Sequence, residues 1–227
     1  MVLQKKDFVE VDFTARVKGG EVFDSTVKEE LEKLHHGHDH PVDARPFVFC
    51  LGEGMFLKSV EDMLIGKPDS PAHYDIELNP EQAFGKREPK LVQMVPLAVF
   101  KQQNANPVPG AMFNFDGRAG KVLTVSGGRV MVDFNNPLAG KIVDYSIDLR
   151  RKVTDMNEKV RALNEFLFRR DFDFSIEGNK LLLKADKGMK QFAEMFKDKF
   201  KEILGLELEV QEVQEKPESK ENREKSE

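Results

Sequence analysis

The chain has 227 residues, of which 40% are hydrophobic and 33% are charged, with a formal net charge of −5. This length predicts more than one domain, each with a modest core. Lys and Arg residues are spread along the chain, which excludes the clustered basic face typical of nucleic-acid binding.

The cysteine count and the apolar runs indicate where the protein works. Cys50 is the only cysteine, so an internal disulfide is impossible and a reducing compartment is favoured. Residues 1–10 contain no apolar signal core, and no run approaches the ~18 apolar residues of a membrane span. We therefore expect a soluble, cytoplasmic protein.

The first segment predicts antiparallel strands around one short helix. Apolar and polar residues alternate over residues 8–17 and 72–78, and residues 46–51 form a strongly apolar strand. Residues 18–21 contain Gly-Gly and are typical of a hairpin turn. Between the later strands, apolar residues from Leu57 to Leu64 fall on one face of a short helix.

The next segment is an insertion with strands and turns of its own. It begins after Ala83-Phe84-Gly85 and ends before Asn136-Pro137-Leu138-Ala139-Gly140. Residues 121–125 and 129–134 read as two strands joined at Gly127-Gly128. A long alternating strand over residues 142–153 then returns the chain to the first module.

The last third predicts a small two-layer domain. Helical stripes at residues 156–167 and 189–204 and strands between and after them give the order α-β-β-α-β. Apolar residues left over from this core, such as Met195 and Phe168, could form a dimer interface. Residues 214–227 are mostly charged, which predicts a disordered tail.

Five motifs in a fixed order carry a family resemblance. They are Gly20-Glu21-Val22-Phe23-Asp24, Gly52-Glu53-Gly54, Ala83-Phe84-Gly85-Lys86-Arg87, Leu91-Val92 with Val95-Pro96, and Val132-Asp133-Phe134-Asn135-Asn136-Pro137-Leu138-Ala139-Gly140-Lys141. In this order they resemble the FKBP-type peptidyl-prolyl cis-trans isomerases. The resemblance is greatest to the SlyD-like branch with an insert in the flap, in its long archaeal type with an extra C-terminal domain.

The resemblance implies an α+β protein with a discontinuous first domain. An antiparallel FKBP-type half-barrel around a short helix would comprise residues 1–87 and 137–153. A mostly-β insert-in-flap chaperone domain would comprise residues 88–136, and the C-terminal α-β-β-α-β domain residues 154–213.

The resemblance also implies an apolar groove in which an X-Pro bond is isomerised. The catalytic set would be Phe23, Asp24, Phe84 and Tyr145. Further groove residues that bind substrate would be Phe13, Phe47, Phe56, Leu57 and Val60. This chain has Phe13 and Phe84 where the family often has Tyr, Val60 where it often has Trp, and Asn136 where it often has His.

The insertion is implied to capture unfolded chains. Its apolar residues are more than a domain of about fifty residues easily buries, although half or more of them could fill the insert's own core. The predicted client-binding residues are Val92, Met94, Val95, Leu97, Phe100, Met112 and Phe113. Expected partners are unfolded proteins with X-Pro bonds, with no nucleic acid or membrane partner and a homodimer through the C-terminal domain.

Two alternatives remain open. A holdase-type chaperone with residual isomerase activity fits the hydroxyls that Phe13 and Phe84 lack. A metal-binding protein fits the closely spaced imidazoles of His35, His36, His38 and His40, which suit Zn²⁺ or Ni²⁺, although a solvated polar loop explains them as well. We expect the isomerase to require no cofactor.

Overall fold

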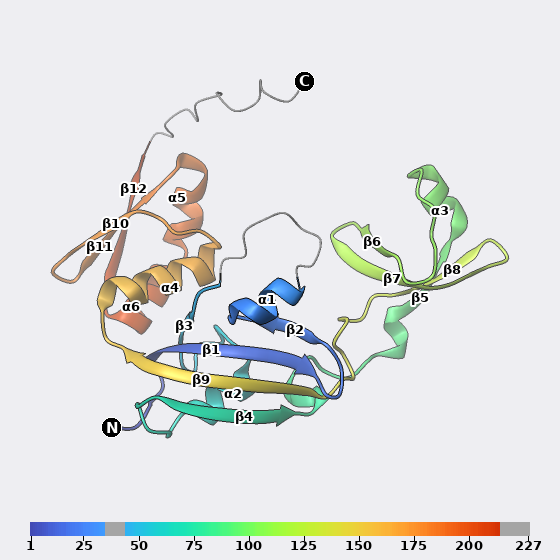
Figure 1. Ribbon diagram of the computed structural model, residues 1–227. Coiled ribbons are helices and arrows are strands. Elements are labelled where there is room, and N and C mark those ends of the chain that lie inside the picture. The colour runs from blue at the N-terminus through green and yellow to red at the C-terminus, as the bar shows by residue number, and fades with distance from the viewer. Residues whose placement is uncertain (35–43, 214–227) are drawn as a thin grey trace, which may run out of the picture. The chain divides into compact units, whose positions relative to one another are not determined.

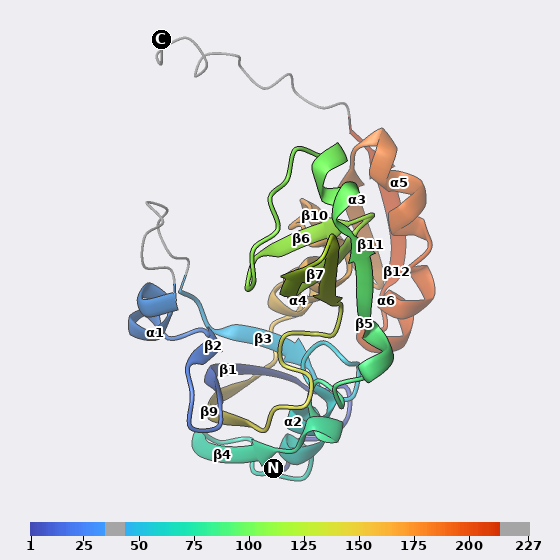
Figure 2. The same ribbon diagram turned by 90° about the vertical axis from the view of Figure 1, so that its right-hand side faces the viewer.

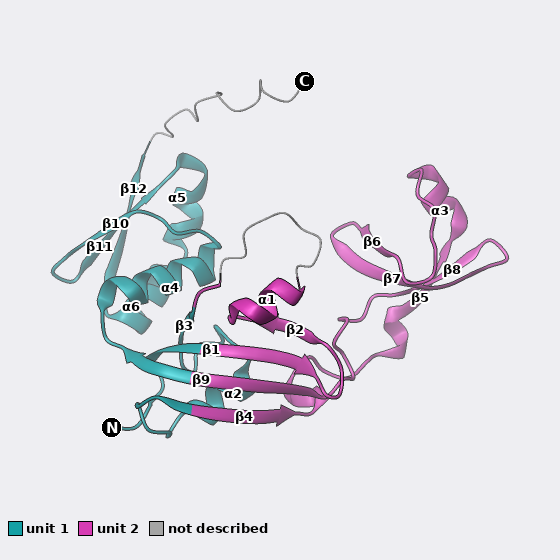
Figure 3. Cartoon of the chain, in the orientation of Figure 1, with its two compact units in different colours: residues 1–11, 46–72, 149–227 teal, residues 12–45, 73–148 magenta. Residues whose placement is uncertain are grey.

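The computed structural model describes residues 1–34 and 44–213, so the predicted His site and the predicted disordered tail lie outside the described residues. The chain divides into two compact units, residues 1–11, 46–72 and 149–227 and residues 12–45 and 73–148 (Figure 3). The predicted insert lies wholly in the second unit and the predicted C-terminal domain wholly in the first. No helix of the described part is long and apolar enough to cross a membrane.

The sheet of the predicted first domain has five strands, which confirms the predicted antiparallel arrangement. Its path runs β2-β1-β9-β4, and β3 pairs with β1 (Figure 1). The strands are β1 (Phe8–Val17), β2 (Val22–Ser25), β3 (Phe47–Cys50), β4 (Ala72–Leu78) and β9 (Val143–Val153). Two short helices accompany them, α1 (Lys28–Leu34) and α2 (Lys58–Leu64).

The insert is a four-stranded antiparallel sheet in the order β5-β8-β7-β6 with one short helix. Its elements are β5 (Val92–Pro96), α3 (Leu97–Gln102), β6 (Met112–Phe115), β7 (Arg118–Ser126) and β8 (Arg129–Asp133). The hairpin at Gly127-Gly128 joins β7 and β8 as predicted, and both residues take positive φ. The apolar run at residues 91–100 divides at Pro96 into a strand and a helix, because Pro suits the entry to a helix.

Aromatic and branched side chains fill the core of the insert. Phe100 is buried with Val122, Val130 and Val132, and its ring meets those of Phe113 and Phe115 edge to face. Gly120 lies beneath this cluster. A Cβ there would come within 2.6 Å of Val132 Cγ1 and 2.8 Å of the Phe134 ring, so only glycine fits.

The C-terminal domain has three helices and a three-stranded mixed sheet in the order β10-β11-β12, and Figure 2 labels these strands. Its elements are α4 (Met156–Phe168), β10 (Phe174–Glu177), β11 (Lys180–Ala185), α5 (Lys187–Glu194), α6 (Lys197–Leu204) and β12 (Glu207–Glu212). β12 runs parallel to β11. The α+β class is confirmed, but the predicted single helix over residues 189–204 is two helices, α5 and α6, with Met195-Phe196 between them.

One residue proposed for a dimer interface lies in the interior instead. Phe168 is buried, and its ring contacts the rings of Phe172, Phe192, Phe196 and Phe200. The prediction for Phe168 was wrong because the helical stripe alone cannot distinguish a core ring from an exposed one. Met195, in contrast, is 76% exposed.

Candidate functional site

An aromatic cluster in the second unit brings together four of the predicted groove residues. The Phe23 ring meets Phe84 edge to face at 5.7 Å between centroids and Tyr145 edge to face at 6.1 Å. The Tyr145 ring also lies 6.2 Å from the Phe13 ring. Phe13 and Tyr145 are buried, whereas Phe23 and Phe84 keep partly exposed faces. The exposed faces therefore offer an apolar surface on a fixed base.

A hydrogen-bonded turn positions Asp24, the polar residue of this cluster. The buried hydroxyl of Ser25 donates to the carbonyl of Phe13 at 2.9 Å, shares a hydrogen bond with Thr14, and accepts one from the Val27 N–H at 3.0 Å. The Phe13 N–H donates to the Thr26 hydroxyl at 2.8 Å. These bonds fix the end of β2 against β1 and thereby the backbone position of Asp24.

Partial burial raises the pKa values of both Asp24 and Tyr145. Although much of the Asp24 side chain is exposed, loss of water around its carboxylate raises its pKa, and a backbone hydrogen bond at Ser25 opposes the rise. Burial raises the pKa of the Tyr145 phenol to about 12, and the negative charge of Asp24 adds to that rise. Tyr145 is therefore a neutral phenol at physiological pH, which suits a hydrogen-bond donor and not a base.

The flap turn presents Phe84 to the cluster. The 3-10 helix η1 (Pro80–Gln82) is closed by a capping box between Asn79 and Gln82. The Gly85 N–H then donates to the Pro80 carbonyl at 2.6 Å, and Gly85 takes a φ of +78°. Only glycine adopts this conformation readily, so the Ala83-Phe84-Gly85 motif is a tight turn that projects one ring.

A second aromatic cluster lies in the first unit and contains the remaining groove residues. The Phe47 ring stacks on Phe49 at 5.2 Å, and both contact Phe56 at 5.3 Å. Leu57 lies partly exposed beside the start of α2, and Val60 is fully buried within that helix. Val60 is therefore a core residue in the described structure, whereas Phe47, Phe56 and Leu57 keep exposed area.

The sequence reasoning missed Glu61, which organises the loop before α2. Its buried carboxylate accepts hydrogen bonds from the N–H groups of Gly52 at 2.8 Å, Gly54 at 3.2 Å and Phe56 at 2.7 Å. Glu61 is a charged residue on the apolar face of the predicted helix, and this position was the signal that could have revealed its role. A carboxylate buried there needs hydrogen-bond donors such as these N–H groups.

The insert separates its predicted client-binding residues into two groups. Phe100 is buried in the core, and Val95, Leu97 and Phe113 pack against that core. Met94 and Met112 are 57% and 52% exposed, and Val92 is partly exposed. The structure therefore leaves three of the seven predicted residues on the surface opposite the core.

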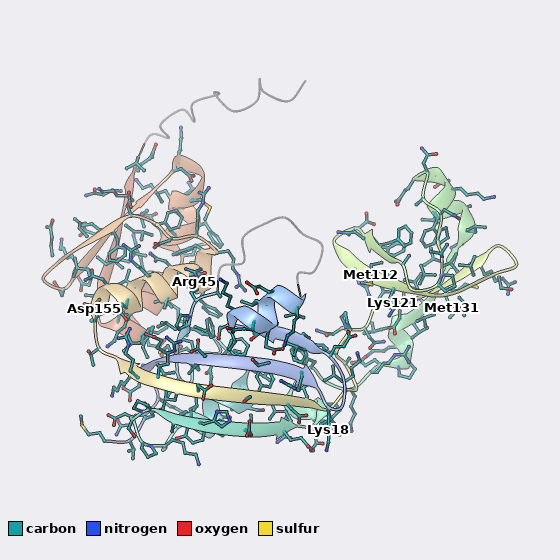
Figure 4. The ribbon with its side chains drawn as sticks, in the orientation of Figure 1. Lys18, Arg45, Met112, Lys121, Met131 and Asp155 are labelled. Carbon is teal, nitrogen blue, oxygen red and sulfur yellow. The ribbon has the colours of Figure 1, made fainter. Side chains whose placement is uncertain are left out.

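These surface residues form one face of the insert sheet, together with Met131, which the sequence reasoning missed. Met94 pairs with Met131 across β5 and β8, and Met112 pairs with Lys121 across β6 and β7. Met131 alternates with the buried Val130 and Val132, and this alternation was the available signal. Figure 4 labels Met112, Lys121 and Met131 on their strands. We call Met94, Met112 and Met131 the methionine face.

Side chains clamp the two segments that connect the insert to the flap. The Asn135 amide accepts from the Glu88 N–H at 2.8 Å and donates to the Glu88 carbonyl at 3.0 Å. Next to it, Arg87 forms an ion pair with Asp133 at 2.7 Å. Both connections are thus held side by side.

Metal and nucleophilic chemistry find no support in the described residues. Residues 1–34 and 44–213 contain no group of three or more His, Cys, Asp or Glu side chains that could hold a metal ion. Burial raises the pKa of the Cys50 thiol to about 12, with smaller contributions from Glu53 and Glu61, so the thiol stays protonated. The site offers an apolar aromatic surface next to the Asp24 carboxylate, whose charge acts on Tyr145.

Two family models match parts of this chain. The family model described as FKBP-type peptidyl-prolyl cis-trans isomerase matches residues 2–101. The model described as FKBP26, IF domain matches residues 93–138.

Individual relatives match about two thirds of the chain. A short-type peptidyl-prolyl cis-trans isomerase of Methanocaldococcus jannaschii is 28% identical over 66% of this chain and 93% of its own length. The FKBP-type isomerase SlyD of Aeromonas hydrophila is 29% identical over 63% of this chain and 60% of its own. The solved structure of the three FKBP domains of wheat FKBP73 is similar over 68% of this chain and 42% of that one, with a TM-score of 0.33 and 17% identity. The chain belongs to the FKBP-type peptidyl-prolyl cis-trans isomerases with an insert-in-flap domain, of the SlyD and FKBP26 kind.

Proposed function

We propose that this isomerase assists protein folding by holding unfolded chains on the methionine face of its insert while its aromatic residues isomerise X-Pro bonds. The observation that carries the proposal is the exposure of Met94 and Met112 on the sheet face opposite the insert's own core. A small domain with a satisfied core gains nothing from exposing these side chains, and exposed apolar patches commonly mark binding surfaces.

The isomerase step is proposed to work without a covalent bond or a cofactor. Rotation about the X-Pro bond meets a barrier of about 18–20 kcal/mol, which arises from amide resonance. The twisted amide has lost much of its resonance dipole, so an apolar surface stabilises it relative to either planar form. Partly exposed faces of Phe23 and Phe84 supply such a surface on a base of Phe13 and Tyr145.

Asp24 is proposed to orient donors near the twisted amide and not to accept a proton. Its turn is fixed by Ser25, and its charge acts on the neutral phenol of Tyr145. A proton acceptor is unnecessary because no bond to hydrogen breaks in the rotation. The family resemblance assigns Phe47, Phe56 and Leu57 to the substrate as well.

Methionine suits the proposed capture of many different clients. Its unbranched thioether side chain adapts to varied apolar partners at little cost. A client bound to the insert keeps its X-Pro bonds at a raised local concentration near the tethered isomerase residues, which raises the rate without any new catalytic contact.

The test separates client binding from turnover. The triple variant Met94→Gln, Met112→Gln, Met131→Gln keeps side-chain length and removes the apolar character. We expect about tenfold slower catalysis of the refolding of a proline-limited protein, with unchanged rates on a short Pro-containing peptide in a protease-free assay. Val213→Gln, which alters an exposed apolar residue at the end of the C-terminal domain, is the control and should change neither rate.

Equal refolding catalysis by the triple variant and by Val213→Gln would contradict the proposal. Deletion of residues 88–135 provides a second test with the same expected separation. If the full chain suppresses aggregation of a denatured client but shows no peptide isomerisation, the holdase alternative holds instead.

We also propose a homodimer through the C-terminal domain and action in the cytoplasm. Met195 and Phe192 remain exposed on this domain and support the dimer. Sedimentation of the full chain and of Met195→Glu should give a dimer and a monomer, respectively.

The His35 to His40 segment remains a proposed Zn²⁺ or Ni²⁺ site, to be tested by calorimetric titration of the full chain and of a His35/His36/His38→Ala variant.

A further inference from the structure

The C-terminal domain reaches the loop that precedes α2 through one charged contact. Within the first unit, Lys199 of α6 places its Nζ 2.6 Å from Oε2 of Glu53. The Glu53 side chain is only 10% exposed. Because this carboxylate is mostly withdrawn from water, its charge-assisted hydrogen bond contributes more than an exposed ion pair does.

Other contacts fix this domain against the same part of the chain. Helix α4 lies against β3, and the Lys159 ammonium lies 5.8 Å from the centre of the Phe8 ring on β1. Lys6, just before β1, pairs with Glu202 of α6 at 3.4 Å. The position of Lys199 relative to the loop is thus set by several independent contacts.

The loop that Glu53 belongs to is held from its other side by Glu61. The Glu61 carboxylate accepts from the N–H groups of Gly52 and Gly54, which flank Glu53, and from that of Phe56. Gly52 and Gly54 take φ values of +85° and +70°. Two carboxylates therefore determine the path of residues 52–56: Glu61 binds its backbone from within, and Glu53 ties it to α6.

Phe56 lies at the end of this loop, in the second aromatic cluster. The centre of its ring lies 5.3 Å from those of Phe47 and Phe49. The hydrogen bond from its N–H is the shortest of the three that Glu61 accepts. We expect a change in the path of residues 52–54 to shift the Phe56 N–H or the Phe56 ring, because only Met55 separates Gly54 from Phe56 and both N–H groups bind Glu61.

We propose that Lys199 is a positioning residue for the isomerase, acting through Glu53 and the Glu61-bound loop to set the place of Phe56. The C-terminal domain thereby supports turnover and is more than an attachment. This inference rests on the proposed placement of Phe56 at the substrate. The pKa of the Lys199 ammonium group is consistent with this contact, because the hydrogen bond to Glu53 raises it.

The first measurement follows the loop directly. In the full chain, Lys199→Met removes the charge and keeps the aliphatic stem. We expect the amide resonances of Gly52, Gly54 and Phe56 to shift, because hydrogen bonding to a carboxylate strongly affects an amide proton. Lys201→Met is the matched control: Lys201 lies on the same helix but pairs with Glu207 of its own domain at 3.5 Å. It should leave these three resonances in place.

The second measurement is turnover. We expect Lys199→Met to lower kcat/KM on a Pro-containing peptide by about threefold to tenfold, as misplacement of a positioned group does. Lys201→Met should stay within about twofold of the parent chain. Glu53→Gln should reproduce the loss, and the double variant Glu53→Gln, Lys199→Met should be no worse than the poorer single variant, since both remove one interaction.

Unshifted amides in Lys199→Met, unchanged turnover, or multiplying losses in the double variant would each overturn the proposal. Failure of the proposed site is recognised separately. Phe56→Ala with full turnover would show that Phe56 does not act on the substrate, whatever the amide resonances report about Lys199.

Discussion

The aromatic cluster of the isomerase module and the methionine face of the insert are both apolar, but they are built in opposite ways. Phe23, Phe84 and Tyr145 are stiff rings held edge to face and braced by a hydrogen-bonded turn at Ser25. Met94 and Met112 stand on an exposed sheet face and are flexible along their whole length.

This difference matches two different tasks. Stabilising one twisted amide requires a surface of fixed shape, because only interactions stronger in the transition state raise the rate. Holding many unrelated clients requires a surface that adapts, because no fixed shape fits them all. In the proposed function, the chain uses rigid aromatic rings for isomerisation and flexible methionines for client capture, and the following predictions test that separation.

The largest expected effect is on the aromatic cluster. Phe84→Ala removes the ring that faces Phe23 and should lower kcat/KM on a short Pro-containing peptide by about tenfold or more. Thermal unfolding should change little, because Phe84 is only partly buried. Phe115→Ala in the insert core is the control and should leave peptide turnover intact. Full turnover in Phe84→Ala would remove this cluster from the active site.

The next effect concerns the core beneath the methionine face. Gly120→Ala forces a Cβ to within 2.6 Å of Val132 and should destabilise the insert by about 1–3 kcal/mol, as overpacking does. Hydrogen exchange of β7 and β8 amides should accelerate and refolding catalysis should fall, while peptide turnover remains. Ala119→Ser, at the adjacent exposed position, should change none of these. Unaltered hydrogen exchange in Gly120→Ala would show that the insert core accommodates the added methyl group.

A smaller effect is expected at the clamp between the two regions. Asn135→Ala removes both side-chain bonds to Glu88 and should slow refolding catalysis by about threefold, since a loosened tether lowers effective concentration. Asn114→Ala is the control: its side chain accepts from the Gly117 N–H at 2.7 Å in a turn within the insert. If both variants behave alike, the clamp has no role in coupling.

The smallest effect is a pH dependence of stability at Asp24. Its folded pKa is raised, so the folded state binds more protons than the unfolded state between the two pKa values, and stability falls as pH rises through that window. Asp24→Asn removes the titrating carboxyl group and with it this fall in stability. The variant's unfolding free energy should therefore increase relative to the parent as pH rises through the Asp titration range, while peptide turnover falls. A constant difference across that pH range would contradict the raised pKa.

Local patterns were sufficient for the strands and for the insertion. Period-two alternation located β1 and β9 to within a residue, and Gly127-Gly128 marked its hairpin. The prediction of one helix over residues 189–204 was wrong, because the helix is interrupted at Met195-Phe196. The helical spacing of apolar residues continues across this interruption, so only the backbone geometry reveals it.

The sequence by itself determined the order of the modules, the family and the identity of the aromatic residues, because these depend on local spacing and on motifs in a fixed order. Tertiary structure alone decided which apolar residues of the insert are exposed, since Phe100 and Met94 look alike in a sequence and differ only in what packs against them. It also revealed Glu61 and the Lys199–Glu53 pair. Contacts between residues nine or 146 positions apart arise from folding and leave no periodic trace in the chain.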